Sequence, residues 1–240
     1  DPGPQIDRAA ELQQKWGTAR GQVWAVGKHR LLCGDVNDAQ AHGVLLEGAK
    51  IDLVLTDPPY GVGIVYGDSV QDSVQAIHDT IGTWLPLLLR WPVVLLASGQ
   101  RALWEYPKPD WMLAWFHSGG SGVGPWGFIT WHQFLAYGHD PYLARGLGSR
   151  PDALECTADR QGVEGHPVVK PLKVWLWLLE RGSPTAGENV LDPFLGSGTT
   201  MVAAEQLGRI CYGMEIEPEY VAVTLERMSG MGLEPRLTNG

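Results

Sequence analysis

The segment Asp57-Pro58-Pro59-Tyr60 places a carboxylate, two rigid prolines and an aromatic ring at the end of an apolar run. That run, 51–56, is aliphatic and β-branched, which predicts a strand covered on both faces. The prolines end the strand, because neither has an N–H group for a neighbouring strand, and both restrict φ. A base could stack on the tyrosine and donate its two amino protons to the aspartate and to the first proline's carbonyl. A plain strand-ending turn is the alternative interpretation.

A second motif, 189–200, is typical of a buried strand, a glycine loop and the start of a helix. Gly196 and Gly198 allow a tight turn and a close approach of the backbone to a ligand. No lysine follows the second glycine, so the segment is not a phosphate loop, and Met201 replaces the third glycine of a dinucleotide fingerprint. The following helix can be capped by a hydroxyl of Ser197, Thr199 or Thr200.

The next apolar run, 209–217, carries Glu215 roughly twenty residues past the glycines, where a carboxylate binds ribose hydroxyls in nucleoside-binding βαβ units. A glycine loop without a cation for phosphates, together with a ribose acid, suits a nucleoside that carries a short zwitterionic chain. S-adenosylmethionine fits that description.

These groups suit methyl transfer to an aromatic amino nitrogen, whose lone pair is delocalised into the ring. Accepting its protons at Asp57 and at the Pro58 carbonyl would localise that lone pair on the nitrogen. A sulfonium methyl is already activated, so an in-line displacement requires positioning more than a covalent enzyme intermediate. Because the amino group of a duplex base is buried in the stack, the base must be rotated out first.

Together the motifs resemble those of the S-adenosylmethionine-dependent amino-group DNA methyltransferases. Residues 57–60 are similar to the family's catalytic motif and 192–200 to its cofactor motif. The catalytic motif comes first, as in the permuted subgroup called beta. The similarity extends over about residues 21–229 and includes five motifs in one consistent order.

The resemblance implies further site residues. Segment 29–35 looks like the strand whose acid, Asp35, reads the cofactor's adenine, and 166–171 resembles a His-Pro-x-x-Lys-Pro element. Lys170 would then meet the cofactor carboxylate, or alternatively anchor a helix end. Segment 131–138 is similar to a late strand in which the family often has Glu instead of Gln133. No metal ligand is expected, and the expected cofactor-binding residues are Asp35, Asp57, Lys170, Asp192, Pro193, Phe194, Gly196, Ser197, Gly198, Thr199, Thr200 and Glu215.

Alternating strand and helix patterns predict an α/β fold with a doubly wound, mostly parallel, Rossmann-like sheet and a small recognition insertion. Ligands bind such sheets beyond the strand carboxyl ends, so Asp57 and the glycine loop are expected to face one crevice. Strands are expected at 31–35, 51–56, 93–98, 111–116, 127–136, 190–192 and 209–215. Helices are expected at 39–46, 72–89, 171–181, 199–207 and 218–228.

The length of 240 residues suits one α/β domain. Residues 1–26 are expected to be an extension or linker and 27–240 the methyltransferase domain. Within it, 139–165 break the strand–helix rhythm and form a short candidate target-recognition insertion. Arg145 and Arg150 are its candidate DNA contacts.

The formal net charge of −9 is unfavourable for binding a polyanion, because non-specific DNA affinity comes from lysine and arginine. We therefore expect modest affinity for DNA, supplemented by a second subunit or a further domain. No apolar run reaches the roughly 18 residues that span a bilayer, which predicts no membrane partner. The three cysteines lack metal-ligand spacing and are expected to be reduced and buried, in a cytoplasmic protein.

Adenine N6 is the expected acceptor, because the resemblance implies that Asp at the first position of 57–60 is commoner for adenine than for cytosine. The absence of a Pro-Cys nucleophile motif argues against methylation of a cytosine ring carbon. Three alternatives stay open: the N4 amino group of cytosine, an RNA base, and a cofactor-binding module that regulates a partner without catalysis.

Overall fold

The computed structural model describes residues 1–59, 62–66, 70–117, 123–157 and 171–238, with only the backbone described at 62–66, 70–79 and Arg101. The chain divides into two compact units. Unit 1 consists of Asp1–Thr56 with Thr185–Gly240, and unit 2 of Asp57–Pro184. Tyr60, Lys170 and the last part of the expected insertion, 158–165, lie outside the described residues.

Unit 1 contains a mostly parallel sheet. Four adjacent strands run parallel: β3 (Leu53–Thr56), β12 (Asn189–Asp192), β13 (Ile210–Glu215) and β2 (His29–Cys33). The strands β1 (Val23–Val26) and β14 (Pro235–Leu237) extend this sheet in antiparallel pairings. All four residues of β3 are buried, as its apolar sequence predicts for a strand covered on both faces.

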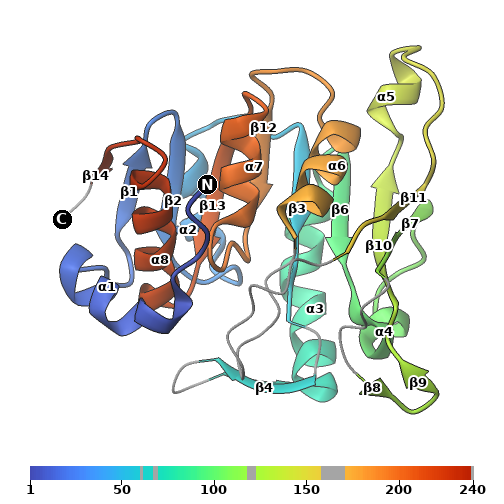
Figure 1. Ribbon diagram of the computed structural model, residues 1–240, viewed down its shortest axis with the longest axis horizontal. Helices are drawn as coiled ribbons and strands as arrows, with labels where there is room; N and C mark the ends of the chain where they lie inside the picture. Colours follow the sequence, from blue (N-terminus) through green and yellow to red (C-terminus); the bar gives the residue numbers. More distant parts are fainter. Residues whose placement is uncertain (60–61, 67–69, 118–122, 158–170, 239–240) are drawn as a thin grey trace. The chain divides into compact units, whose positions relative to one another are not determined.

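Helices cover both faces of the unit 1 strands, with α7 (Thr199–Gln206) and α8 (Pro218–Ser229) on one face and α2 (Ala39–Leu46) on the other (Figure 1). A short η1 turn (Ile6–Arg8) leads into α1 (Ala9–Trp16), which packs on α8. There Leu12 is fully buried against Ala222 and Val223. The expected extension, 1–26, therefore contributes both α1 and β1 to the packed body of unit 1.

The larger group of paired strands in unit 2 has the order β11 (Ala153–Glu155), β7 (Trp111–Phe116), β10 (Trp131–Gly138) and β6 (Val93–Ala97). Strand β10 is antiparallel to both β6 and β7, whereas β11 is parallel to β7. Two small two-stranded sheets accompany them, β4 (Val62–Tyr66) with β5 (Val70–Ser73) and β8 (Val123–Gly124) with β9 (Gly127–Phe128). The helical segments are α3 (Val74–Leu89), α4 (Gly99–Ala102), η2 (Leu103–Glu105), α5 (Pro141–Ala144) and α6 (Leu172–Gly182).

The α/β class predicted from the sequence is confirmed, and the bounds expected at 111–116 and 39–46 match β7 and α2. The strand expected over 127–136 is instead two strands, because β9 closes a local hairpin with β8 before β10 begins at Trp131. The short strands β1, β11 and β14 were not predicted.

Candidate cofactor and catalytic site

The carboxyl ends of the four parallel strands of unit 1 all carry polar residues. Strand β3 ends at Thr56, β12 at Asp192 and β13 at Glu215, while Asp35 follows β2 by two residues. Parallel neighbours end at the same edge of a sheet, so these groups share one edge of unit 1.

Asp192 organises the start of the glycine loop. Its buried carboxylate accepts a 2.6 Å hydrogen bond from Thr56 Oγ1 and a 3.1 Å bond from the Phe194 backbone N–H. The Thr200 hydroxyl, on α7, also donates to it. The contacts of Asp192 therefore join β3, the loop and α7.

The two loop glycines have different reasons to be glycine. Both have positive φ, +55° at Gly196 and +83° at Gly198. A Cβ added at Gly198 would lie 2.8 Å from the Thr224 side chain on α8, so close packing requires its absence. A Cβ added at Gly196 would meet no described atom within 4 Å, so this position faces open space. Within 192–200, Gly196 and Phe194 are the half-buried residues and the others are buried.

The cap predicted for α7 is wrong. Its N-cap is Gly198, and the hydroxyls expected to cap it bond elsewhere, Thr200 to Asp192 and Thr199 to a guanidinium of α8. Packing of the loop against α8 thus takes precedence over local capping of the helix.

Glu215 lies directly against the loop. Its Oε2 accepts a 2.8 Å hydrogen bond from Gly196 N–H, and its Oε1 accepts a 2.9 Å bond from Glu217 N–H. Burial is the main cause that raises the pKa of Glu215 to about 7, although these two backbone donors act in the opposite direction. A buried carboxylate of this kind gains from additional donors, and two ribose hydroxyls would supply them.

Asp35 is exposed at the end of the neighbouring strand. Its Oδ1 accepts 2.9 Å hydrogen bonds from both the backbone and the side-chain nitrogens of Asn37. The adjacent Gly34 N–H donates to the Glu215 carbonyl at 2.9 Å, which ties the end of β2 to the end of β13. Of the two acids expected to bind the nucleoside, Glu215 is therefore the last residue of β13 and Asp35 follows the neighbouring, hydrogen-bonded end of β2.

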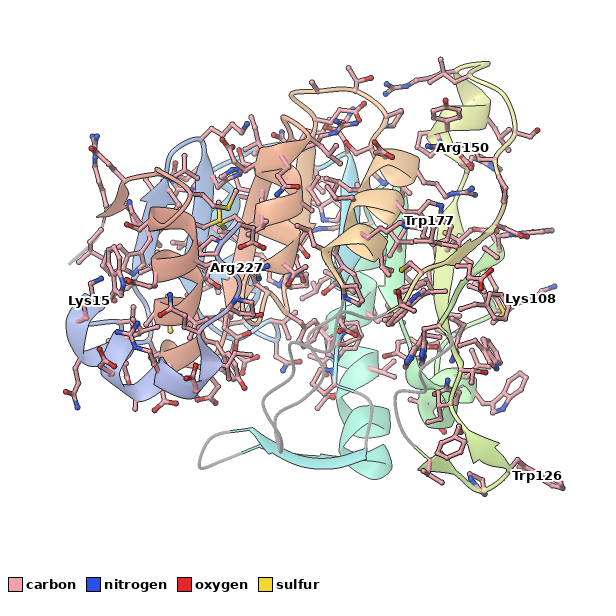
Figure 2. The ribbon with its side chains drawn as sticks, viewed as in Figure 1. Lys15, Lys108, Trp126, Arg150, Trp177 and Arg227 are labelled. Atoms are coloured by element: carbon pink, nitrogen blue, oxygen red, sulfur yellow. The ribbon has the colours of Figure 1, made fainter. Side chains whose placement is uncertain are left out.

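Two residues of α8 support the loop and were not identified from the sequence. The Arg227 guanidinium, which is buried, donates to the Ser197 carbonyl at 3.0 Å and to the Thr199 hydroxyl at 3.1 Å. The Thr224 hydroxyl donates to the Gly196 carbonyl at 3.1 Å. Figure 2 labels Arg227 within unit 1. The sequence does contain one sign of this role for Arg227. The arginine lies on the same helix as Val221, Leu225 and Met228, which are all buried.

The catalytic motif predicted at 57–60 begins at the residue after Thr56. Asp57 and Pro59 are half-buried and Pro58 is buried. Because the Thr56 side chain is bonded to Asp192, the motif starts one peptide unit from a residue that is fixed to the glycine loop. Thr56 itself was not singled out in the sequence.

The expected recognition insertion is attached to α6. The Arg150 guanidinium lies 3.6 Å from the Tyr142 ring centroid and donates to the Glu180 carbonyl at 3.0 Å (Figure 2). The buried Arg181 of α6 reaches back to Asp140 at 3.6 Å. Arg150, a candidate DNA contact, is therefore engaged in fixing the insertion. Gln133 is buried on β10, and its amide donates to Ser98 Oγ at 3.1 Å and to the Gly99 carbonyl at 2.6 Å.

The described residues include no cluster of three or more histidine, cysteine or acidic side chains that could hold a metal. They also include no helix with the length and apolarity needed to cross a bilayer. Cys33, Cys156 and Cys211 are free and buried, which confirms the expectation that the three cysteines are reduced and lie in the interior.

Comparison with known proteins finds similarity to DNA methylases. Residues 149–226 match the family model of the DNA methylases, N6_N4_Mtase. The chain is 29% identical to "Putative methylase YubD" of Escherichia coli (strain K12) over 202 residues, which are 77% of this chain and 84% of the relative. It is 24% identical to the type II methyltransferase M.HpaI of Haemophilus parainfluenzae over 83% of this chain and 74% of that protein.

Solved structures show the same fold. The M1.HpyAVI–SAM complex superposes with a TM-score of 0.60 at 19% identity, covering 82% of this chain and 98% of that one. The PvuII DNA methyltransferase, described as cytosine-N4-specific, gives a TM-score of 0.56 at 17% identity over 84% and 90% of the two chains. The chain is therefore similar to DNA methylases over residues 149–226, and it shares the methyltransferase fold with these solved structures.

Proposed function

We propose that this chain is a DNA methyltransferase that transfers a methyl group from S-adenosylmethionine to the exocyclic amino group of a base. The observation that carries the proposal is the 2.6 Å hydrogen bond from Thr56 to Asp192. It joins the strand that ends at the Asp57 motif to the start of the glycine loop. The bond thus links the residue that precedes Asp57 to Asp192, the first residue of the cofactor motif, at the carboxyl edge of unit 1.

The cofactor would be held at that edge. Glu215 would accept hydrogen bonds from the ribose hydroxyls, and Asp35 would bind the adenine, as the family resemblance implies. Phe194 and the backbone at Gly196 would contact the cofactor, because they are the accessible positions of the loop and Gly196 faces open space. When bound, S-adenosylmethionine supplies an activated sulfonium methyl group. Lys170, expected to meet the carboxylate, lies outside the described residues.

The base would be held by the catalytic motif. Asp57 and the Pro58 carbonyl would accept the two amino protons, which localises the nitrogen lone pair toward the incoming methyl group. Asp57 need not be a strong base, because the amino proton becomes acidic once the nitrogen carries the methyl group. Tyr60, outside the described residues, would stack on the base that is rotated out of the duplex.

Adenine N6 is our proposed acceptor, on the strength of the aspartate that opens the motif, and we propose the permuted, beta-type order of motifs. The N4 amino group of cytosine is the second candidate, favoured by the structural likeness to a methyltransferase described as cytosine-N4-specific. The intact carboxylate at Asp57 argues against a purely regulatory module.

The test is transfer of tritium from labelled S-adenosylmethionine into duplex DNA, single-stranded DNA and RNA, followed by nucleoside analysis of the product. We expect label in N6-methyladenine from duplex DNA. Asp57→Ala should abolish transfer while the Kd for the cofactor stays nearly unchanged. Label in N4-methylcytosine would mean that the acceptor is cytosine and not adenine. Label in RNA alone would mean that the substrate is RNA. A loss of both transfer and cofactor binding in Asp57→Ala would contradict the catalytic role proposed for Asp57.

A further inference from the structure

The hairpin formed by β8 and β9 carries an unusual surface. Trp126, in its turn, is fully exposed (101%), and the paired residues Val123 and Phe128 are 75% and 77% exposed. Figure 2 shows the Trp126 side chain at the tip of the hairpin, pointing away from the rest of unit 2. Burying large apolar groups is favourable, so a hairpin that presents three of them to water marks a contact surface.

The hairpin and the two strands that flank it in the sequence, β7 and β10, carry no charged residue. The whole stretch 111–138 contains no aspartate, glutamate, lysine or arginine, in a chain that has 27 acidic and 18 basic residues. Trp111, Phe116 and Trp131, from β7 and β10, add further exposed rings to this stretch. The hairpin itself therefore presents no carboxylate to a polyanion, whereas Asp152 accepts a hydrogen bond from Trp111, and Glu155 of the neighbouring strand β11 pairs with Phe116. The favourable term available to a polyanion at the hairpin is contact with aromatic rings.

The hairpin is anchored at its base. The register pairs Phe134 of β10 with Ala97, the last residue of β6, so the start of β10 extends beyond the carboxyl end of β6. Gln100 Nε2 donates to the Trp131 carbonyl at 2.7 Å, and His117 N–H donates to the Thr130 carbonyl at 2.9 Å. The hairpin thus projects from the carboxyl edge of β6, the edge at which open α/β sheets bind ligands.

We propose that this hairpin is a DNA wedge, in which the Trp126 ring, with Pro125 beside it, inserts between bases of the substrate duplex next to the nucleotide that is rotated out. The inference rests on the proposed methyl transfer to DNA. Rotating a base out leaves a gap in the stack, and proteins commonly fill such gaps or open base steps with apolar side chains. Stacking also supplies affinity that this acidic chain gains poorly from phosphates, since its net charge is −9.

The experiment compares Trp126→Ala with Trp104→Ala, a matched control because Trp104 is also highly exposed (86%) and lies on η2, outside the hairpin. Binding of a fluorescently labelled duplex is measured over a series of salt concentrations. We expect Trp126→Ala to raise the Kd for DNA by about tenfold or more, the usual scale for one base–aromatic stack. The slope of log Kd against log salt should stay unchanged, because a ring neutralises no phosphate. Trp104→Ala should behave like the unsubstituted chain, and Trp126→Phe should retain most of the affinity.

Other results would overturn the wedge. Equal DNA affinity in the two alanine variants is one, and a changed salt slope in Trp126→Ala is another. A loss of self-association in Trp126→Ala, measured by sedimentation at unchanged DNA affinity, would assign the hairpin to a second copy of this chain. Failure of the methyl-transfer proposal can be distinguished from failure of the wedge. In that case no labelled product would form, while DNA binding would still depend on Trp126.

Discussion

Thr56 and Asp192, 136 positions apart in the chain, are joined by a 2.6 Å hydrogen bond between the hydroxyl and the carboxylate, both buried at the carboxyl ends of neighbouring strands. The residue after Thr56 opens the proposed catalytic motif, and the residue after Asp192 opens the glycine loop. The bond therefore fixes the spacing of Thr56 and Asp192 at the carboxyl edge of unit 1.

Replacing Thr56 with valine keeps the shape of the side chain and removes this donor. A buried carboxylate oxygen of Asp192 would then lose a partner, so we expect the free energy of unfolding to fall by about 1–3 kcal/mol. Chemical denaturation measures the change. Thr56→Ser restores the hydroxyl and is the matched control, and equal stability of the valine and serine variants would contradict this role.

Cofactor binding is expected to depend on pH through Glu215. Burial raises the pKa of this carboxyl group to about 7, so it is largely protonated in the free chain at pH 6. Ribose hydroxyls favour the ionised form, so binding lowers the pKa and releases a proton below pH 7. The Kd for S-adenosylmethionine should therefore fall as pH rises from about 5 to 7, by at most about tenfold per pH unit, and then level off. Calorimetry in buffers of different ionisation enthalpy measures the released proton.

Glu215 also makes the folding stability of the chain without cofactor depend on pH, and this stability falls as pH rises. Between its unfolded pKa of 4.5 and its folded value of about 7, the folded chain binds more protons, so stability contributed by the protonated form is lost as pH rises through this window. Glu215→Gln has no titrating group and should flatten both profiles. A cofactor Kd that rises between pH 5 and 7, or a slope retained in the glutamine variant, would exclude Glu215 as the source.

The two loop glycines should respond differently to alanine. Gly198→Ala combines a φ of +83° with a Cβ 2.8 Å from Thr224, so we expect a loss of stability of about 1–3 kcal/mol. Gly196→Ala has a φ of +55° and no described atom within 4 Å, so its cost should be about 1 kcal/mol, from the left-handed backbone alone. Its methyl group would enter the space proposed for the cofactor, and the Kd for S-adenosylmethionine should rise by more than in Gly198→Ala at a temperature where both are folded. The reverse order of these Kd values would argue against a cofactor at Gly196.

The parts of the site that were predictable from the sequence are those specified locally. The apolar run before Asp57, the strand–glycine loop–helix pattern at 189–200 and the spacing to Glu215 each lie in a short segment with its own periodicity and turn residues. The supports of the loop were not predictable, because Thr56, Thr224 and Arg227 act across distances of 28 to 136 positions that a local pattern does not encode. The same reason applies to β14, a three-residue strand that exists by pairing with β1.

Arg227 combines a buried charge with hydrogen bonds to the glycine loop and to the N-terminal residue. Its guanidinium is 3% exposed and bonds to Ser197, to Thr199 and, at 2.6 Å, to the carboxylate of Asp1. Burial lowers its pKa to about 10, so it stays protonated at neutral pH. A planar group with several fixed donors can serve these partners at once, which a lysine ammonium cannot do in the same geometry.

Arg227→Met should therefore cost about 1–3 kcal/mol of unfolding free energy, because it leaves a loop carbonyl and the Asp1 carboxylate, whose side chain is 12% exposed, without their donor. Arg227→Lys should keep the charge yet weaken cofactor binding, since it loses part of the bonding to the loop at Ser197 and Thr199. Arg236→Met removes an exposed pair with Glu234, 3.2 Å apart, and as the control it should change stability by less than about 0.5 kcal/mol. The decisive measurement is the Kd for S-adenosylmethionine of the lysine variant at a temperature where it is fully folded. A Kd equal to that of the unsubstituted chain would mean that Arg227 stabilises α8 and the N-terminal segment without positioning the loop.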